Sequence, residues 1–288
     1  MDSRSRAKKP LGIALRLARK LRMTAGEYTG VYDENVGWGK TGDVTYEVDV
    51  PLEEAVAEYF SDLSTPCRVI TEDAGVVDYG LEPKYVFMID PLDGSRNARR
   101  GLPLHCSSIA VYEAGATELS EAVSSVIERH DLREEYVAVR GGGATLNDRK
   151  IKPSGKTVLN DAVLALGCHF APAVGMYAKL SSRLGREVKS HERNITVKSY
   201  GSTALELALL ASGKVDMLLD IRASTRYRAA PKTYDIAAGL LLCSEAGAIV
   251  EYGGHTLPER LPLDPTVRVQ VAGAGNMRLF NILRNSLR

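Results

Sequence analysis

The chain has 288 residues and a formal net charge of +1 at pH 7, with 44% hydrophobic and 25% charged residues. This length and composition predict one large globular domain or two closely packed halves, and they exclude wholesale disorder. The near-zero charge gives no sign of binding to nucleic acid or to an anionic membrane. No apolar stretch approaches the ~18 residues that a membrane-spanning helix needs, and the polar, basic N-terminus does not resemble a signal peptide. Four scattered cysteines without C-x-x-C spacing predict free buried thiols in a reducing cytoplasm.

Hydrophobic periodicity predicts a mixture of helices and short strands. The first helix is basic and amphipathic, so it could lie on a membrane, but its apolar face has no aromatic residue, which favours packing against the domain. In chain order, the predicted helices cover residues 10–25, 51–62, 177–184, 202–212 and 234–246, and the predicted strands cover residues 68–70, 85–89, 107–112, 122–127, 135–139, 162–166 and 217–220. Because strands and helices do not alternate strictly, the pattern favours an α+β protein over a doubly wound nucleotide-binding fold.

The segment from Asp43 to Asp93 is strongly acidic, with thirteen acidic and only two basic side chains. A run of charges usually marks a solvated face. Several of these acids, however, directly follow apolar runs that predict buried strands, as Asp90 follows the run at 85–89. A solvated face explains such positions poorly, so this segment is the first candidate for a chemical site.

The sharpest motif in this segment is the turn that carries Asp90 and Asp93. Pro91 fixes the backbone and Gly94 allows a tight bend, so both carboxylates are expected on one side of the turn, with the Leu92 carbonyl between them. Such hard oxygen ligands suit Mg²⁺, Mn²⁺ or Ca²⁺. The alternative is a capped turn with two surface aspartates.

Two further acids favour the metal hypothesis. Glu72 follows the apolar pair Val69–Ile70, so the end of a predicted strand again delivers a carboxylate. Asp235 opens the predicted helix at 234–246, where an aspartate can be a metal ligand or an ordinary N-terminal helix acid. The five histidines show no zinc-ligand spacing, and His105 is expected to be a packed or rim residue rather than a general base.

These motifs, in this order, resemble the inositol monophosphatase family, including its archaeal enzymes that act on both inositol phosphates and fructose 1,6-bisphosphate. The resemblance is carried by Asp90-Pro-Leu-Asp93-Gly-Ser95, by Glu72, by Tyr234-Asp235-Ile-Ala-Ala-Gly, and by the segments 42–49, 97–103, 140–147 and 201–204. Tyr234 stands where the family often has tryptophan, a change expected to affect packing only. Extra sequence at 223–232 makes the surroundings of the substrate unusual.

The resemblance implies a layered αβαβα sandwich and a homodimer in the cytoplasm. It places the site between an N-terminal half, residues 1–155, that carries most metal ligands and a C-terminal half, residues 156–288, that carries substrate contacts and one metal ligand. Two or three Mg²⁺ ions are implied, with Mn²⁺ as a substitute, and their ligands are Glu72, Asp90, the Leu92 carbonyl, Asp93 and Asp235. The catalytic residues implied to orient a water are Asp43, Thr45 and Ser95. The substrate contacts implied are Gly94, Ser95, Gly201, Ser202, Thr203, Asp220 and Arg222.

The activity implied is Mg²⁺-dependent hydrolysis of a sugar or polyol phosphate monoester, with fructose 1,6-bisphosphate and myo-inositol 1-phosphate as first candidates. This places the chain in carbohydrate metabolism, with a small-molecule substrate and neither nucleic acid nor membrane as a partner. One alternative is a 3′-phosphatase acting on 3′-phosphoadenosine 5′-phosphate, and another is a non-catalytic regulatory binding protein of the same fold. The basic segment with Arg222, Arg226, Arg228 and Lys232 is either a solvated loop or dimer contact, or a grip for a second phosphate.

Overall fold

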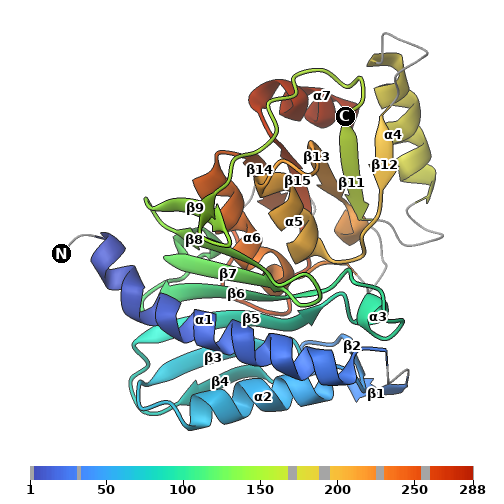
Figure 1. Cartoon of the computed structure of the whole chain (residues 1–288). Helices are drawn as coiled ribbons and strands as arrows, with labels where there is room; N and C mark the ends of the chain where they lie inside the picture. The colour runs from blue at the N-terminus through green and yellow to red at the C-terminus, as the bar shows by residue number, and fades with distance from the viewer. Residues whose placement is uncertain are drawn as a thin grey trace.

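The computed structural model describes residues 3–30, 34–167, 174–187, 195–224, 230–253 and 260–287, which form two large sheets and a short hairpin (Figure 1). The eight-stranded sheet has the order β10-β9-β8-β7-β6-β5-β3-β4. Its strands are β3 (Cys67–Thr71), β4 (Gly75–Tyr79), β5 (Tyr85–Asp93), β6 (Cys106–Glu113), β7 (Ser124–Arg129), β8 (Glu134–Val139), β9 (Gly143–Leu146) and β10 (Arg149–Lys150). The five-stranded sheet has the order β12-β11-β13-β15-β14. Its strands are β11 (Val163–Gly167), β12 (Thr196–Lys198), β13 (Met217–Asp220), β14 (Ile249–Gly253) and β15 (Gln270–Ala274), and the hairpin is formed by β1 (Asn35–Trp38) and β2 (Val44–Tyr46).

Six helices complete a five-layer arrangement that confirms the predicted αβαβα sandwich. One pair packs on the outer face of the eight-stranded sheet, a second pair lies between the two sheets, and a third pair packs on the outer face of the five-stranded sheet (Figure 1). In that order the pairs are α1 (Ser3–Tyr28) with α2 (Val50–Ser61), α5 (Thr203–Ala211) with α6 (Thr233–Ala246), and α4 (Val174–Glu187) with α7 (Met277–Leu287).

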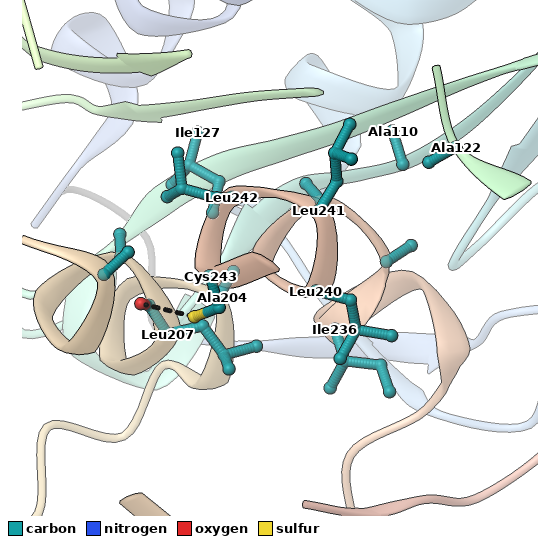
Figure 2. Packing of buried hydrophobic residues seen from close by; sticks show 14 of the residues in the cluster. Ala110, Ala122, Ile127, Ala204, Leu207, Ile236, Leu240, Leu241, Leu242 and Cys243 are labelled. Carbon is teal, nitrogen blue, oxygen red and sulfur yellow. Dashed lines mark hydrogen bonds between the residues drawn. The ribbon is translucent and has the colours of Figure 1, made fainter. Parts of the chain in front are cut away.

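The central pair of helices is buried on nearly every side because sheets cover both faces of this layer. All nine residues of α5 are buried, as are most residues of α6. The helices pack so closely that a Cβ added at Gly239 would lie 2.5 Å from a methyl carbon of Leu207. In Figure 2 the thiol of Cys243 donates to the carbonyl oxygen of Leu207, at 3.3 Å, across the same contact. This close contact fixes the two helices relative to each other.

Most predicted elements are present, with differences at their ends. The first helix is longer than expected, because α1 extends through Pro10 toward the N-terminus. The predicted strand at 85–89 was too short, since β5 continues through Asp90 to Asp93, with a register irregularity against β6. Ten strands and α-helices were not predicted: β1, β2, β4, β9, β10, β12, β14, β15, α3 (Ser95–Ala98) and α7. The division into halves at residue 155 stays a prediction, although it falls between the last strand of one sheet and the first strand of the other.

Two predictions about the chain as a whole can be compared with the described residues. Cys67, Cys106 and Cys243 are free and buried, as expected, whereas Cys168 lies outside the described residues. None of the described helices is long and apolar enough to cross a membrane.

Candidate active site

The metal turn, defined here as Asp90–Ser95, lies at the end of β5. Because β5 runs parallel to β3, with Ile89 opposite Thr71, the acids that follow these two residues, Asp90 and Glu72, emerge side by side. Gly94 has φ +98°, and a Cβ added there would lie 2.7 Å from the carbonyl oxygen of Leu104. Only glycine therefore fits the bend without displacing backbone.

Three carboxylates converge beside this turn. Asp90, Asp93 and Asp235 each offer an oxygen, and these oxygens lie within 4.8 Å of one another. Asp235 is in the first turn of α6, where its carboxylate accepts a hydrogen bond from the backbone N–H of Lys232 at 2.5 Å. Asp93 accepts from the Ser202 hydroxyl at 2.8 Å and from the backbone N–H of Ala204 at 2.6 Å. Both central helices thus aim their N-terminal ends at the acids of the metal turn.

A cavity of about 500 Å³ opens over the metal turn. It joins residues of the hairpin, of β5, of the central helices and of the loops that follow β3, β12 and β13, so it is built from segments far apart in the sequence. Its walls include Trp38, Asp43, Val44, Tyr46, Glu72, Asp90, Leu92, Asp93, Gly94, Ser95, Arg96, Gly201, Thr203, Arg222, Ala230, Pro231, Tyr234 and Asp235.

The acids of this cavity carry strongly shifted pKa values. Burial, followed by repulsion from neighbouring carboxylates, raises the pKa of Glu72 and of Asp90 well above the ordinary range. Burial raises the pKa of Asp93 to about 7, and burial together with the Asp93 charge raises that of Asp235 to about 8. Crowded carboxylates of this kind, with a backbone carbonyl beside them, are the hard oxygen donors that fit a divalent cation.

Asp43 has partners that the sequence did not indicate. Its Oδ2 atom lies 2.6 Å from the Nζ of Lys232, which is almost completely buried, and accepts a hydrogen bond from the Tyr234 hydroxyl at 2.5 Å. Lys232 also donates to the carbonyl oxygen of Thr41 at 2.8 Å. The expectation that Tyr234 affects packing only was therefore wrong. The grouping of Lys232 with a phosphate-gripping loop was also wrong, because its ammonium pairs with an acid of the site.

Asp49 lies beside the cavity residue Ser95, and the sequence analysis gave it no role. It is buried, burial raises its pKa to about 7, and the Ser95 hydroxyl beside it lowers that pKa in part. Its Oδ2 accepts from the backbone N–H of Tyr46 at 2.8 Å, while its Oδ1 has no hydrogen-bond partner among the described residues. The available signal was its place six residues after Asp43, in the same acidic segment.

The predicted catalytic and substrate residues fall into two groups. Asp43, Gly94, Ser95, Gly201, Thr203 and Arg222 line the cavity. The other three are not among the lining residues. Thr45 donates to Asp73 at 2.6 Å, Ser202 donates to Asp93, and Asp220 is fully buried. Arg222 binds the Asp220 carboxylate through Nε and Nη2, the latter at 2.6 Å. Arg226 and Arg228 lie outside the described residues.

Comparison with known proteins agrees with this geometry. The model of the inositol monophosphatase family matches residues 10–286. A fructose-1,6-bisphosphatase/inositol-1-monophosphatase of Methanothermobacter thermautotrophicus is 30% identical, covering 96% of this chain and 95% of the relative. The Nus factor SuhB of Escherichia coli K12 is 31% identical, covering 85% of this chain and 86% of the relative. The crystal structure of an inositol monophosphatase–fructose 1,6-bisphosphatase superimposes with a TM-score of 0.76 at 25% identity, covering 96% of this chain and 98% of the other.

The family match spans nearly the whole chain and includes every strand and helix that builds the cavity. The chain therefore belongs to the inositol monophosphatase family and is a phosphomonoesterase.

Proposed function

We propose that this chain hydrolyses a sugar or polyol phosphate monoester with the help of Mg²⁺, and that fructose 1,6-bisphosphate, myo-inositol 1-phosphate or both are its substrates. The observation that carries the proposal is the convergence of Asp90, Asp93 and Asp235 at one end of the cavity. The two activities for which the Methanothermobacter thermautotrophicus relative is named support the choice of substrates. A cytoplasmic homodimer is part of the same proposal.

Five groups would hold two or three Mg²⁺ ions. They are the carbonyl of Leu92 and the carboxylates of Glu72, Asp90, Asp93 and Asp235. When bound there, Mg²⁺ supplies charge neutralisation and lowers the pKa of a water. Gly94 and Ser95 would contact the phosphate, whereas Gly201, Thr203 and Arg222 would contact the alcohol part of the ester.

Asp49 and Ser95 are the residues that we propose to orient the attacking water. Asp43 and Thr45 were predicted for this role, but the carboxylate of Asp43 is held by Lys232, and Thr45 is hydrogen-bonded to Asp73. The free Oδ1 of Asp49 and its pKa of about 7 suit a group that accepts a proton near neutral pH.

A panel of phosphate esters, assayed with Mg²⁺ and again after chelation, tests the proposal directly. We expect hydrolysis of fructose 1,6-bisphosphate or myo-inositol 1-phosphate, and loss of activity when the metal is removed. Preference for 3′-phosphoadenosine 5′-phosphate would support the nucleotide alternative. No hydrolysis of any ester would favour a regulatory binding protein, an alternative raised by the similarity to the Nus factor SuhB. Activity undiminished by chelation would contradict the metal mechanism.

Mg²⁺ is expected to raise the melting temperature of the protein. A cation that binds only the folded chain stabilises it by mass action, and here it also relieves the repulsion among buried carboxylates. Thermal unfolding monitored with and without Mg²⁺ should show a much smaller rise in Asp90→Asn. An equal rise in this variant would show that the metal binds elsewhere.

The basic segment remains a proposed grip for the second phosphate of a bisphosphate, now through Arg226 and Arg228 rather than Lys232. Replacing both arginines with alanine should lower kcat/KM for fructose 1,6-bisphosphate at least about tenfold more than for myo-inositol 1-phosphate, since a charged hydrogen bond contributes about 1.5–3 kcal/mol. Arg96→Ala, at a described arginine that lines the cavity, is the comparison variant. Equal losses on both substrates in the double variant would make the segment a solvated loop or dimer contact.

A further inference from the structure

The hairpin of β1 and β2 presents one of its two faces to the cavity. Residues directly opposite each other in an antiparallel pair lie on the same face, and so do alternate residues of one strand. Trp38 pairs with Val44, and Tyr46 lies two residues after Val44, so these three side chains share a face. All three line the cavity over the metal turn. They are called the hairpin wall below.

The opposite face of the hairpin is attached to the loop that carries Glu72. Thr45, whose side chain alternates with those of the hairpin wall, donates from its hydroxyl to the carboxylate of Asp73 at 2.6 Å. The backbone N–H of Lys40 donates to the carbonyl oxygen of Asp73 at 2.9 Å. The Thr41 hydroxyl donates to the carbonyl oxygen of Glu72 at 2.6 Å. These bonds hold the hairpin wall at a fixed place relative to the acids of the metal turn.

Trp38 supplies the exposed aromatic surface of the hairpin wall. It is 60% exposed, whereas Val44 is half-buried. The ring of Tyr46 has the guanidinium carbon of Arg99 over it, 4.1 Å from the ring centre. An indole on the wall of a cavity offers a flat apolar surface that a ligand can cover, and aromatic side chains commonly serve this purpose in binding sites.

The other walls of the cavity are polar. The metal turn and Asp235 supply carboxylates, whereas Gly201, Thr203 and Arg222 supply groups that can hydrogen-bond to hydroxyls. A sugar or cyclitol in ring form matches both kinds of wall, because its hydroxyl groups project from the edge of the ring and its face carries C–H bonds. An open-chain polyol has the same hydroxyl groups but no such face.

We propose that Trp38 makes this site specific for phosphate esters whose alcohol part is a ring, and that its indole covers the C–H face of that ring. Thr203 and Arg222 then contact the hydroxyl groups at the edge. The inference rests on the proposed function, because it concerns the same site. An indole offers neither an acid nor a base to the hydrolysis, so Trp38 contributes to substrate binding, and its removal should change KM rather than kcat.

The fluorescence of Trp38 tests the contact without reference to activity, because the chain has a single tryptophan. The probes are the phosphonate analogues of myo-inositol 1-phosphate and of glycerol 3-phosphate, which cannot be hydrolysed, each with Mg²⁺ and at a concentration that saturates its rise in melting temperature. We expect the inositol analogue to shift the emission to shorter wavelength and to lower the quenching by acrylamide severalfold. The glycerol analogue should leave both unchanged. Equal protection by the two analogues would overturn the proposal.

Steady-state kinetics with Mg²⁺ test the specificity. Trp38→Ala should raise KM for myo-inositol 1-phosphate about three- to tenfold with kcat nearly unchanged, which is the range for loss of one aromatic contact. Trp38→Phe should keep most of the affinity. For glycerol 3-phosphate, KM, or the inhibition constant if this ester is not hydrolysed, should change less than about twofold in Trp38→Ala.

The matched control is Val36→Ala. Val36 is on the same strand and is 51% exposed, but it is not among the described residues that line the cavity, so this variant should behave as wild type. Similar melting temperatures would show that all variants are folded. An unchanged KM for the inositol ester in Trp38→Ala, or equal increases for both esters, would overturn the proposal.

The outcomes also separate this inference from the proposed function. If the wild type hydrolyses neither ester, the proposed function is contradicted, and protection of the indole by the inositol analogue alone would still support the role of Trp38. No binding of the inositol analogue would overturn both. Protection by 3′-phosphoadenosine 5′-phosphate but not by the inositol analogue would show that the indole stacks on a base, and this would overturn specificity for a sugar or cyclitol ring.

Discussion

Asp235→Asn is expected to lower kcat/KM for the preferred phosphate ester by roughly 10²–10³-fold, because losing a ligand of the proposed metal site would cost several kcal/mol of transition-state stabilisation. Asparagine keeps the size of the side chain and an oxygen that can accept from the backbone N–H of Lys232. Steady-state kinetics at saturating Mg²⁺ measure the loss, and Asp93→Asn should act in the same direction. Asp78→Asn, at an exposed ion pair with Arg68, should be indistinguishable from wild type.

The same substitution should stabilise the protein when metal is absent. The pKa of Asp235, raised to about 8, and that of Asp93, raised to about 7, lie well above the values near 4 expected in the unfolded chain. The folded state therefore binds more protons than the unfolded state between about pH 4 and pH 8, so metal-free stability falls as pH rises through this window. Urea unfolding of metal-free Asp235→Asn should show a weaker fall than wild type. If Asp235→Asn lowered activity but showed the same fall of stability with pH as wild type, the raised pKa values attributed to these crowded acids would be contradicted.

Lys232→Met is expected to lower the free energy of unfolding by about 3 kcal/mol in metal-free buffer. Breaking a buried ion pair typically costs 3–5 kcal/mol, because the remaining charge has lost its partner. The low end of this range applies because the carboxylate left behind is partly hydrated: the Asp43 side chain is 20% exposed, whereas that of Lys232 is 3% exposed. Urea denaturation monitored by circular dichroism measures the loss.

A second substitution separates the charge effect from the loss of packing. In the double variant Asp43→Asn/Lys232→Met no charge is left without its partner, and Tyr234 can still donate to the asparagine oxygen. The double variant should therefore recover a large part of the lost stability, which is the signature of coupled residues. Strictly additive losses would show that the Lys232–Asp43 contact contributes little.

The sequence was most informative where the chemistry is local. Asp90 and Asp93 could be assigned because a buried strand, a proline and a glycine lie next to them, and these three features constrain the backbone over a few residues. Short strands were harder to predict. β12 has three exposed residues, and β15 is buried throughout, so neither shows the alternation of a half-buried strand. Such segments become strands because neighbouring strands pair with them.

Contacts between distant residues account for the site residues that the sequence analysis missed or misplaced. Tyr234 reaches Asp43 across 191 residues, Lys232 reaches the same carboxylate, and nothing near any of the three in the sequence indicates this contact. Ser202 was expected to face the substrate, but the approach of α5 to the metal turn places its hydroxyl on Asp93. Asp220 was expected at the same face, but it is buried at the end of the central strand β13, beside Gly167 of β11, where Arg222 pairs with it.

The amino-acid sequence by itself determined the metal turn, the central helices beside it and the motifs that resemble the phosphatase family, because each of these features depends on residues close together in the chain. Only the tertiary structure decided which carboxylates keep free oxygens and which are paired. Asp49 is left with a free oxygen and Asp43 is held by Lys232, although the two acids lie in one short acidic segment. The physical reason is that a carboxylate's charge state and partners depend on burial and on groups brought near it by folding, and neither is encoded in its immediate neighbours.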